Sequence, residues 1–104
     1  MKVIDNVEQF KELTSSGNVV IQFSATWCQP CKVLTRTMEN VTPEHPGVYF
    51  YKVDIDNFDR SVLMEYNVRS VPKLLMFSNG YDVGEMVGSR PADVINDFIN
   101  NHKK

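Results

Sequence analysis

The chain contains 104 residues, carries a formal net charge of −2, and is 42% hydrophobic and 23% charged. This length and composition predict a single folded domain, residues 1–104, with a sizeable core, and they argue against disorder. No basic block offers an electrostatic footprint for nucleic acid, and no segment approaches the roughly 18 apolar residues of a membrane span. The first residues lack the apolar stretch of a signal peptide, so we expect a cytoplasmic protein that contacts no membrane.

The first half of the chain predicts two strands, each followed by a helix. Residues 2–4 favour a short strand, and Asn6 is suited to cap the helix that follows. Residues 19–24 are apolar except for Gln22, which indicates a central strand covered on both faces. The second helix ends before Pro43. The apolar positions of these helices recur at helical spacing: Val7, Phe10, Leu13 and Thr14 in the first, then Val33, Leu34, Thr37, Met38 and Val41.

A loop, a strand and a short helix come next. Residues 43–47 contain two prolines and a glycine, which predicts a loop, and we expect His45 within it to be solvated. Residues 48–53 are rich in β-formers and predict another central strand. Residues 60–66 predict a short helix with Val62, Leu63 and Tyr66 facing inward.

The last third of the chain predicts a hairpin and a final helix. Asn79-Gly80 is a hairpin turn signal between strands at 73–77 and 82–87, and Pro91 sits in the first turn of the helix. The resulting order, βαβαβαββα, predicts an α/β fold with a central mixed five-stranded sheet and helices on both faces. The apolar face of the final helix consists of Val94, Ile95, Phe98 and Ile99.

The two cysteines of the chain lie where the central strand ends and the second helix begins. They belong to the run Trp27-Cys28-Gln29-Pro30-Cys31-Lys32. The first N–H groups of a helix lack intrahelical partners and the dipole is positive there, so both favour a thiolate at Cys28. Cys31 lies one turn further on, within reach of Cys28, and Pro30 fits the first turn. The spacing therefore predicts a pair that alternates between dithiol and disulfide.

Two other interpretations of the cysteine pair remain open. A purely structural disulfide is possible, although so short a loop removes only about 2 kcal/mol of chain entropy in the entropic model. A zinc site would need four ligands, and the remaining soft candidates are His45 and His102. Their spacing matches no common zinc finger, so we predict no metal site.

Several motifs resemble those of the thioredoxin family, and the resemblance extends over essentially the whole chain. The cysteine run is similar to the family's W-C-G-P-C-K motif. Residues 68–72, V-R-S-V-P, resemble the family segment that ends in a cis-proline facing the cysteines. Residues 77–80, Gly84 and Val87-Gly88 match the family's hairpin and the glycine that lines its substrate groove.

The resemblance implies a protein-disulfide reductase that works by thiol–disulfide exchange. Cys28 would be the exposed nucleophile that attacks a disulfide in a partner protein, and Cys31, more buried, would resolve the mixed disulfide. No cofactor would be bound, because the redox-active disulfide Cys28–Cys31 would be reduced in trans by an NADPH-dependent reductase of the thioredoxin-reductase type. The resemblance also implies a monomer.

The resemblance further implies a recognition surface around the cysteines. Pro72 would follow a cis peptide bond and leave Val71 free to pair with an extended substrate backbone. A proline that merely starts an edge strand is the alternative for Pro72, and a core residue is the alternative for Trp27. The recognition surface would consist of Trp27, Gln29, Pro30, Val71, Pro72, Val87 and Gly88.

The largest departure from the family pattern is Gln22, six residues before Cys28, where the family usually carries a buried aspartate. An amide forms hydrogen bonds but does not titrate, so the Cys31 proton must leave through water or another group. Lys52 matches the lysine that pairs with that aspartate. The hypothesis is that a buried Lys52 accepts the proton; the alternative is that its ammonium reaches solvent or bonds Asp54 or Asp56.

Gln29 and Lys73 also depart from the family pattern. Gln29 replaces a glycine between the cysteines, where residues tune the redox poise. Lys73 follows the expected cis-proline, where a threonine is common. Its charge would stabilise the Cys28 thiolate or select acidic partners, and a solvated surface lysine is the alternative.

Two rival functions stay open at this point. A glutaredoxin-like, glutathione-linked oxidoreductase shares the C-x-x-C pair, but the tryptophan before Cys28 does not favour it. A thioredoxin fold recruited as a binding subunit of a larger complex is the second rival, since Gln22 replaces the usual acid.

Overall fold

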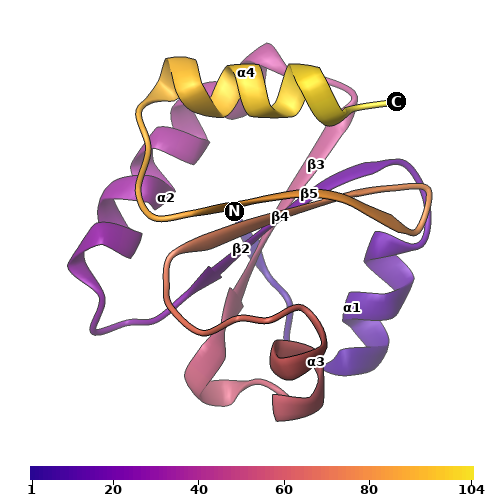
Figure 1. Ribbon diagram of the computed structural model, residues 1–104, viewed down its shortest axis with the longest axis vertical. Coiled ribbons are helices and arrows are strands. Elements are labelled where there is room, and N and C mark those ends of the chain that lie inside the picture. The colour runs from indigo at the N-terminus through magenta and orange to yellow at the C-terminus, as the bar shows by residue number, and fades with distance from the viewer.

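The computed structural model describes residues 1–104, and its centre is a mixed five-stranded sheet in the spatial order β1-β3-β2-β4-β5 (Figure 1). The strands are β1 (Lys2–Val3), β2 (Asn18–Ser24), β3 (Val48–Asp54), β4 (Lys73–Ser78) and β5 (Tyr81–Val87). The helices are α1 (Val7–Thr14), α2 (Gln29–Val41), α3 (Arg60–Glu65) and α4 (Ala92–His102). Two short 3-10 turns, η1 (Thr42–Glu44) and η2 (Ile55–Asn57), flank β3. The predicted element order and fold class are confirmed.

Strand directions follow from how the chain connects the strands. β3 pairs in parallel with both β1 and β2, as expected for strands joined through helices. β4 runs antiparallel to β2 and to β5, and the β4–β5 hairpin turns at Asn79-Gly80 with positive φ at both residues. A bulge between Met76 and Phe77 shifts the β4–β5 register. β2 therefore sits at the centre, where its C-terminal end is enclosed on both sides.

One face of the sheet is covered by α2 and α4, which lie together in Figure 1. Their inward side chains meet the even-numbered positions of the central strands, including Val20 and Leu74. The helical members of this core are Leu34, Met38, Val41, Ile95, Phe98 and Ile99.

The opposite face is covered by α1 and α3, on the other side of the sheet in Figure 1. Phe10 of α1 lies at the centre of this layer and contacts Phe23, Phe58, Tyr66 and Phe77 with ring centroids 5.8–6.4 Å apart. Because β2 carries apolar residues toward both layers, it is buried along Val19–Ser24, as its composition predicts.

His45 departs from the sequence-based expectation. It was expected to be solvated, but it is 4% exposed. Its Nε2 lies 2.7 Å from Asn96 Oδ1, and since a side-chain amide oxygen only accepts, Nε2 carries the proton. The turn at η1 brings His45 next to α4, so its imidazole is buried between the loop and that helix.

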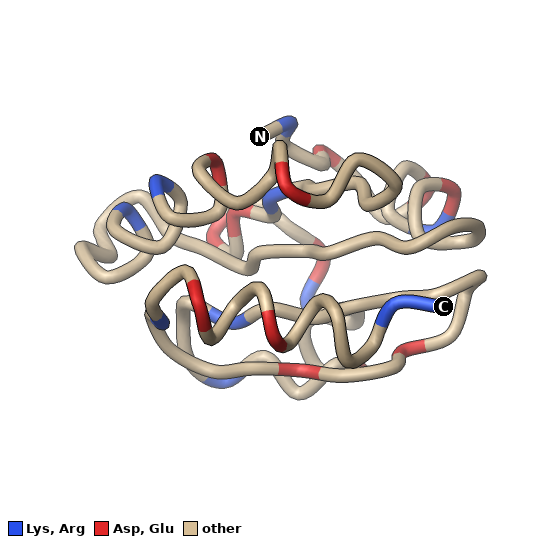
Figure 2. Tube along the Cα trace, turned by 90° about the horizontal axis from the view of Figure 1, so that it is seen from above, with Lys and Arg blue, Asp and Glu red and all other residues tan.

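Charged side chains are scattered over the surface. Figure 2 shows acidic and basic residues interspersed, without an extended patch of one sign. No helix is long and apolar enough to cross a membrane.

Candidate active site

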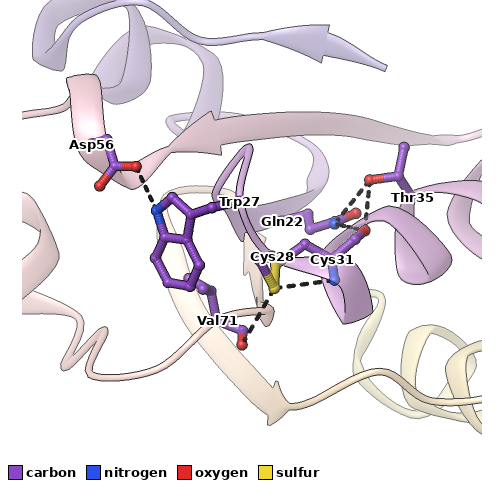
Figure 3. The surroundings of a disulfide bond; sticks show 7 residues. All are labelled: Gln22, Trp27, Cys28, Cys31, Thr35, Asp56 and Val71. Carbon is purple, nitrogen blue, oxygen red and sulfur yellow. Dashed lines mark hydrogen bonds between the residues drawn. A yellow bond between two sulfur atoms is a disulfide. The ribbon is translucent and has the colours of Figure 1, made fainter.

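The two cysteines lie at the junction of β2 and α2, where the sequence predicted them. They are joined as a disulfide, with their Cα atoms 5.3 Å apart (Figure 3). The loop between Ser24 and Gln29 turns the chain from the central strand into the helix. Since β2 pairs with β3 on one side and β4 on the other, the disulfide follows directly from the central strand of the sheet.

Cys28 is the N-cap of α2. Its Sγ accepts a hydrogen bond of 3.2 Å from the backbone N–H of Cys31, and its carbonyl accepts from the N–H of Lys32. The first turn of the helix contains no acidic side chain. The N–H of Cys31 and the positive end of the helix dipole both act on this sulfur, so the site stabilises a thiolate at Cys28 when the disulfide is reduced.

Cys28 is less exposed than expected. Cys28 is 5% exposed and Cys31 is 1% exposed, so the expectation of an exposed Cys28 is wrong. Cys28 is nevertheless the more accessible of the two cysteines, as expected. The cause is the packing of Ala25, Ile55 and Val71 around the disulfide. The carbonyl oxygen of Val71 lies 3.8 Å from Cys28 Sγ, which in the disulfide has no proton to donate.

The segment that faces the cysteines contains a cis peptide bond between Val71 and Pro72, as the resemblance implied. The carbonyl of Pro72 accepts a hydrogen bond of 2.8 Å from the N–H of Gly88. This bond places the end of β5 next to the cis-proline. Pro72 itself is buried, whereas Val71 is half-buried and Val87 is 47% exposed.

The residues next to Cys28 also belong to the expected recognition surface. Gln29 and Pro30 are exposed, and Trp27 is 69% exposed, so the alternative that it is a core residue is wrong. In Figure 3 the indole extends from the loop that carries Cys28 toward Asp56. Its Nε1 donates a hydrogen bond of 2.8 Å to Asp56 Oδ2.

Asp56 is a site residue that sequence reasoning considered only as a possible partner of Lys52. It belongs to η2, directly after β3. Because β2 and β3 are parallel neighbours, their carboxyl ends meet at the same edge of the sheet, which brings η2 beside the loop that follows β2. The signal in the sequence was the largely polar run at residues 54–59, which directly follows the strand predicted at residues 48–53.

Gln22 lies beneath the disulfide and is fully buried. Its Nε2 donates to the carbonyl of Cys31 at 3.2 Å and to Thr35 Oγ1 at 3.1 Å, and the Thr35 hydroxyl donates to the same carbonyl at 3.0 Å (Figure 3). Gln22 Oε1 has no hydrogen-bond partner. The amide therefore fixes the first turn of α2 from below, and Thr35 is a second residue that sequence reasoning missed.

Lys52 is the strand neighbour of Gln22 and is half-buried. It forms no ion pair or hydrogen bond with Asp54 or Asp56, so the expected bond to these aspartates is wrong. The other part of that alternative, an ammonium that reaches solvent, is consistent with its half-buried side chain. The Asp54 carboxylate instead accepts hydrogen bonds from the N–H of Asp56 and from the side-chain amide of Asn57, both in η2. Lys52 lines an open cavity of about 490 Å³ with Val3, Ser24, Ala25, Thr26, Lys32, Thr35 and Asp54.

Lys73 is not a solvated surface lysine, because its side chain is 2% exposed. Its ammonium pairs with Glu85 and bonds backbone carbonyls at the end of α3. β4 turns this side chain toward the layer of α1 and α3, away from the helix that carries the cysteines. Its charge is therefore matched by groups other than a thiolate at Cys28.

The side chains with a shifted pKa lie away from the disulfide. Burial raises the pKa of Tyr66, with the nearby Glu65 adding to the effect, and burial also raises the pKa of Asp82. Hydrogen bonds from Ser61 lower the pKa of Asp59, which caps α3. No three His, Cys, Asp or Glu side chains are grouped to hold a metal ion. His45 and His102 instead bond Asn96 and the carbonyl of Phe98.

Comparison with known proteins gives a consistent result. The family model described as "Thioredoxin" matches residues 2–101. The chain is 40% identical over 96 residues to the thioredoxin of Chlamydia trachomatis, covering 92% of this chain and 93% of that protein. It is 40% identical over 76 residues to Thioredoxin-1 of Saccharomyces cerevisiae, covering 73% of each. The crystal structure of Malassezia sympodialis thioredoxin superposes with a TM-score of 0.87 at 36% identity, covering 97% of this chain and 91% of that one.

Proposed function

We propose a catalytic cycle for this chain, which belongs to the thioredoxin family and is a thiol–disulfide oxidoreductase. Proteins of this family act on disulfide substrates and are reduced by a reductase. The observation that carries the proposal is the position of Cys28 as the cap of α2, with the N–H of Cys31 directed at its sulfur.

In the first step the Cys28 thiolate attacks one sulfur of a substrate disulfide. A bond forms between Cys28 Sγ and that sulfur, the substrate S–S bond breaks, and the departing thiolate takes a proton from water. The N–H of Cys31 and the start of α2 favour the thiolate as the attacking species. Cys28 is the better placed of the two because Cys31 lies deeper, at 1% exposure.

In the second step Cys31 resolves the mixed disulfide. Its sulfur attacks Cys28 Sγ, the bond between Cys28 and the substrate breaks, and the reduced substrate leaves as a thiolate. In the closed disulfide the two Cα atoms are 5.3 Å apart, which lies within the usual range for a disulfide. Two electrons pass from the cysteine pair to the substrate.

The Cys31 proton needs a route, because Gln22 does not titrate. We propose that Lys52 accepts it as the neutral amine, which becomes an ammonium, through the cavity that Lys52 and Thr35 both line. Thr35 lines this cavity and its hydroxyl bonds the Cys31 carbonyl, so the cavity borders the residue that carries the proton. Solvent water that enters the cavity is the alternative acceptor of the Cys31 proton.

Substrate recognition is proposed to occur on the surface of Trp27, Gln29, Pro30, Val71, Pro72, Val87 and Gly88. The backbone N–H of Val71 has no partner within the chain, which supports pairing with an extended substrate segment. The exposed side chains of Trp27 and Val87 supply apolar area for contact with the substrate. The hydrogen bond from Trp27 to Asp56 fixes the indole for this contact.

Regeneration is proposed to depend on an NADPH-dependent flavoprotein reductase of the thioredoxin-reductase type. We further propose that the protein acts as a monomer in the cytoplasm, as a single domain spanning residues 1–104. The interspersed surface charges support a range of protein substrates rather than one strongly charged class (Figure 2).

An insulin reduction assay with defined reductants tests the proposal. We expect turnover with NADPH and thioredoxin reductase, and loss of turnover in Cys28→Ser, because the attacking sulfur is removed. Turnover driven by glutathione and glutathione reductase instead would assign a glutaredoxin-like function. If the biological activity survives in Cys28→Ser, the chain acts as a binding subunit.

A further inference from the structure

Lys73 is a charged residue in the interior of the molecule. It is the first residue of β4, directly after the cis peptide bond at Val71–Pro72, and its side chain is 2% exposed. Removing an ammonium from water is costly unless it is paired and hydrogen-bonded. The buried ammonium of Lys73 therefore needs partners for its charge and for its N–H donors.

The Lys73 ammonium has three partners, which match its three N–H donors. Nζ donates to the backbone carbonyl of Tyr66 at 2.8 Å and to that of Asn67 at 3.2 Å. It also forms an ion pair of 2.9 Å with Glu85 Oε2 on β5. One side chain thus joins the end of α3, the start of β4 and the middle of β5.

These contacts close a ring around the segment that faces the disulfide. The chain leaves α3 at Tyr66, turns at Asn67 with φ 57°, and returns through Pro72 to Lys73. The Lys73 side chain then reaches back to the carbonyls where the segment began. Residues 67–72 are therefore held at both ends by one residue.

The closed segment contains the backbone proposed to meet substrate. The carbonyl of Val71 lies 3.8 Å from Cys28 Sγ, and the carbonyl of Pro72 accepts from the N–H of Gly88. Glu85, the ionic partner of Lys73, lies two residues before Val87 on the same strand. The Lys73 ammonium therefore contacts both the start of the segment that contains Val71 and Pro72 and the strand that contains Val87.

We propose that Lys73 is a positioning residue for substrate recognition, whose ammonium holds residues 67–72 in the conformation that pairs with an extended protein substrate beside Cys28. The inference rests on the proposed role of Val71 and Pro72. Because Glu85 and two carbonyls match the charge of Lys73, its effect on the chemistry of the cysteines is small. Its loss should weaken the binding of protein substrates while the redox properties of the disulfide stay unchanged.

Lys73→Met tests this, since methionine retains much of the length but has no donor. We expect its KM for insulin to rise about tenfold, with kcat, the rate toward the small hydroxyethyl disulfide and the reduction potential unchanged. A small disulfide needs no strand pairing, so it separates recognition from chemistry. Lys11→Met, an exposed lysine on α1, is the matched control and should match the wild type in every measurement.

Glu85→Ala keeps the test decisive if Lys73→Met does not fold. Glu85 is an exposed strand residue, and its removal leaves the two carbonyl bonds, so we expect a KM increase of about twofold to threefold for insulin alone. Equal changes toward insulin and hydroxyethyl disulfide, or no change in KM in any folded variant, would overturn the inference. Failure of the wild-type protein to reduce insulin would instead refute the proposed function.

Discussion

At the scale of single residues, the site separates the task of stabilising a thiolate from the task of moving a proton. The N–H of Cys31 acts on Cys28 Sγ, while the Cys31 side chain lies above an amide that does not titrate. Lys52, opposite Gln22 on the neighbouring strand, is the candidate base. The cavity that Lys52 lines would therefore serve the second step of the reaction and not the first.

Lys52→Met is the corresponding test. If Lys52 accepts the Cys31 proton, resolution of a preformed mixed disulfide should slow on the order of a hundredfold, the range of one positioned general base. Attack by Cys28 on the substrate should keep its rate. Stopped-flow fluorescence across pH would separate the two steps. Lys32→Met, an exposed lysine on the same cavity, is the control. Identical pH profiles in Lys52→Met and the wild type would remove Lys52 and leave water as the acceptor.

At the scale of elements, the site depends on how β2 supports the first turn of α2. Gln22 donates to the Cys31 carbonyl and to Thr35 across the strand–helix contact. The amide satisfies these groups without placing a charge in a fully buried position. The position of the helix start, and hence of both sulfurs, follows from this contact.

Gln22→Asp should destabilise the protein in a pH-dependent way. A carboxyl group in this buried position favours its neutral form, so its folded pKa lies above its unfolded value and stability falls as pH rises through that range. We expect the free energy of unfolding in urea at pH 7 to fall by about 2–3 kcal/mol, with a smaller loss at acidic pH. The same substitution at exposed Gln29 should change it by less than about 0.5 kcal/mol. A pH-independent loss would mean that a cavity, rather than a buried charge, is responsible.

At the scale of the whole molecule, the topology gathers three distant segments at one end of the sheet. The loop after β2 contributes the cysteines, the segment before β4 contributes Val71 and Pro72, and the end of β5 contributes Gly88. Parallel pairing of β2 with β3 adds Asp56 beneath Trp27. The proposed recognition surface therefore depends on the strand order and not on any one segment.

Much of this arrangement could be predicted from the residues alone. The apolar run before Cys28, the helical spacing after it and the Asn79-Gly80 turn predicted the element order, because each is a local pattern of side chains. The cis bond before Pro72 followed from the resemblance of residues 68–72 and not from local chemistry.

The rest depends on contacts between residues distant in sequence. Lys73 follows a proline and precedes an apolar run, residues 74–77, and nothing in this local pattern shows that the carbonyls of Tyr66 and Asn67 accept hydrogen bonds from its ammonium. His45 looks like a loop residue until α4 supplies Asn96. The low exposure of Cys28 likewise depends on the packing of Ile55 and Val71, which lie far along the chain.

The most direct test of the account is to identify which sulfur reacts first. Cys31→Ser, reduced and then mixed with a disulfide-containing protein, should accumulate a mixed disulfide, and peptide mass spectrometry should place the substrate on Cys28. Cys28→Ser under the same conditions should form no such adduct at neutral pH, because Cys31 lies deeper and lacks the cap position. Adducts on Cys31 of Cys28→Ser, formed as fast as those on Cys28 of Cys31→Ser, would contradict the account.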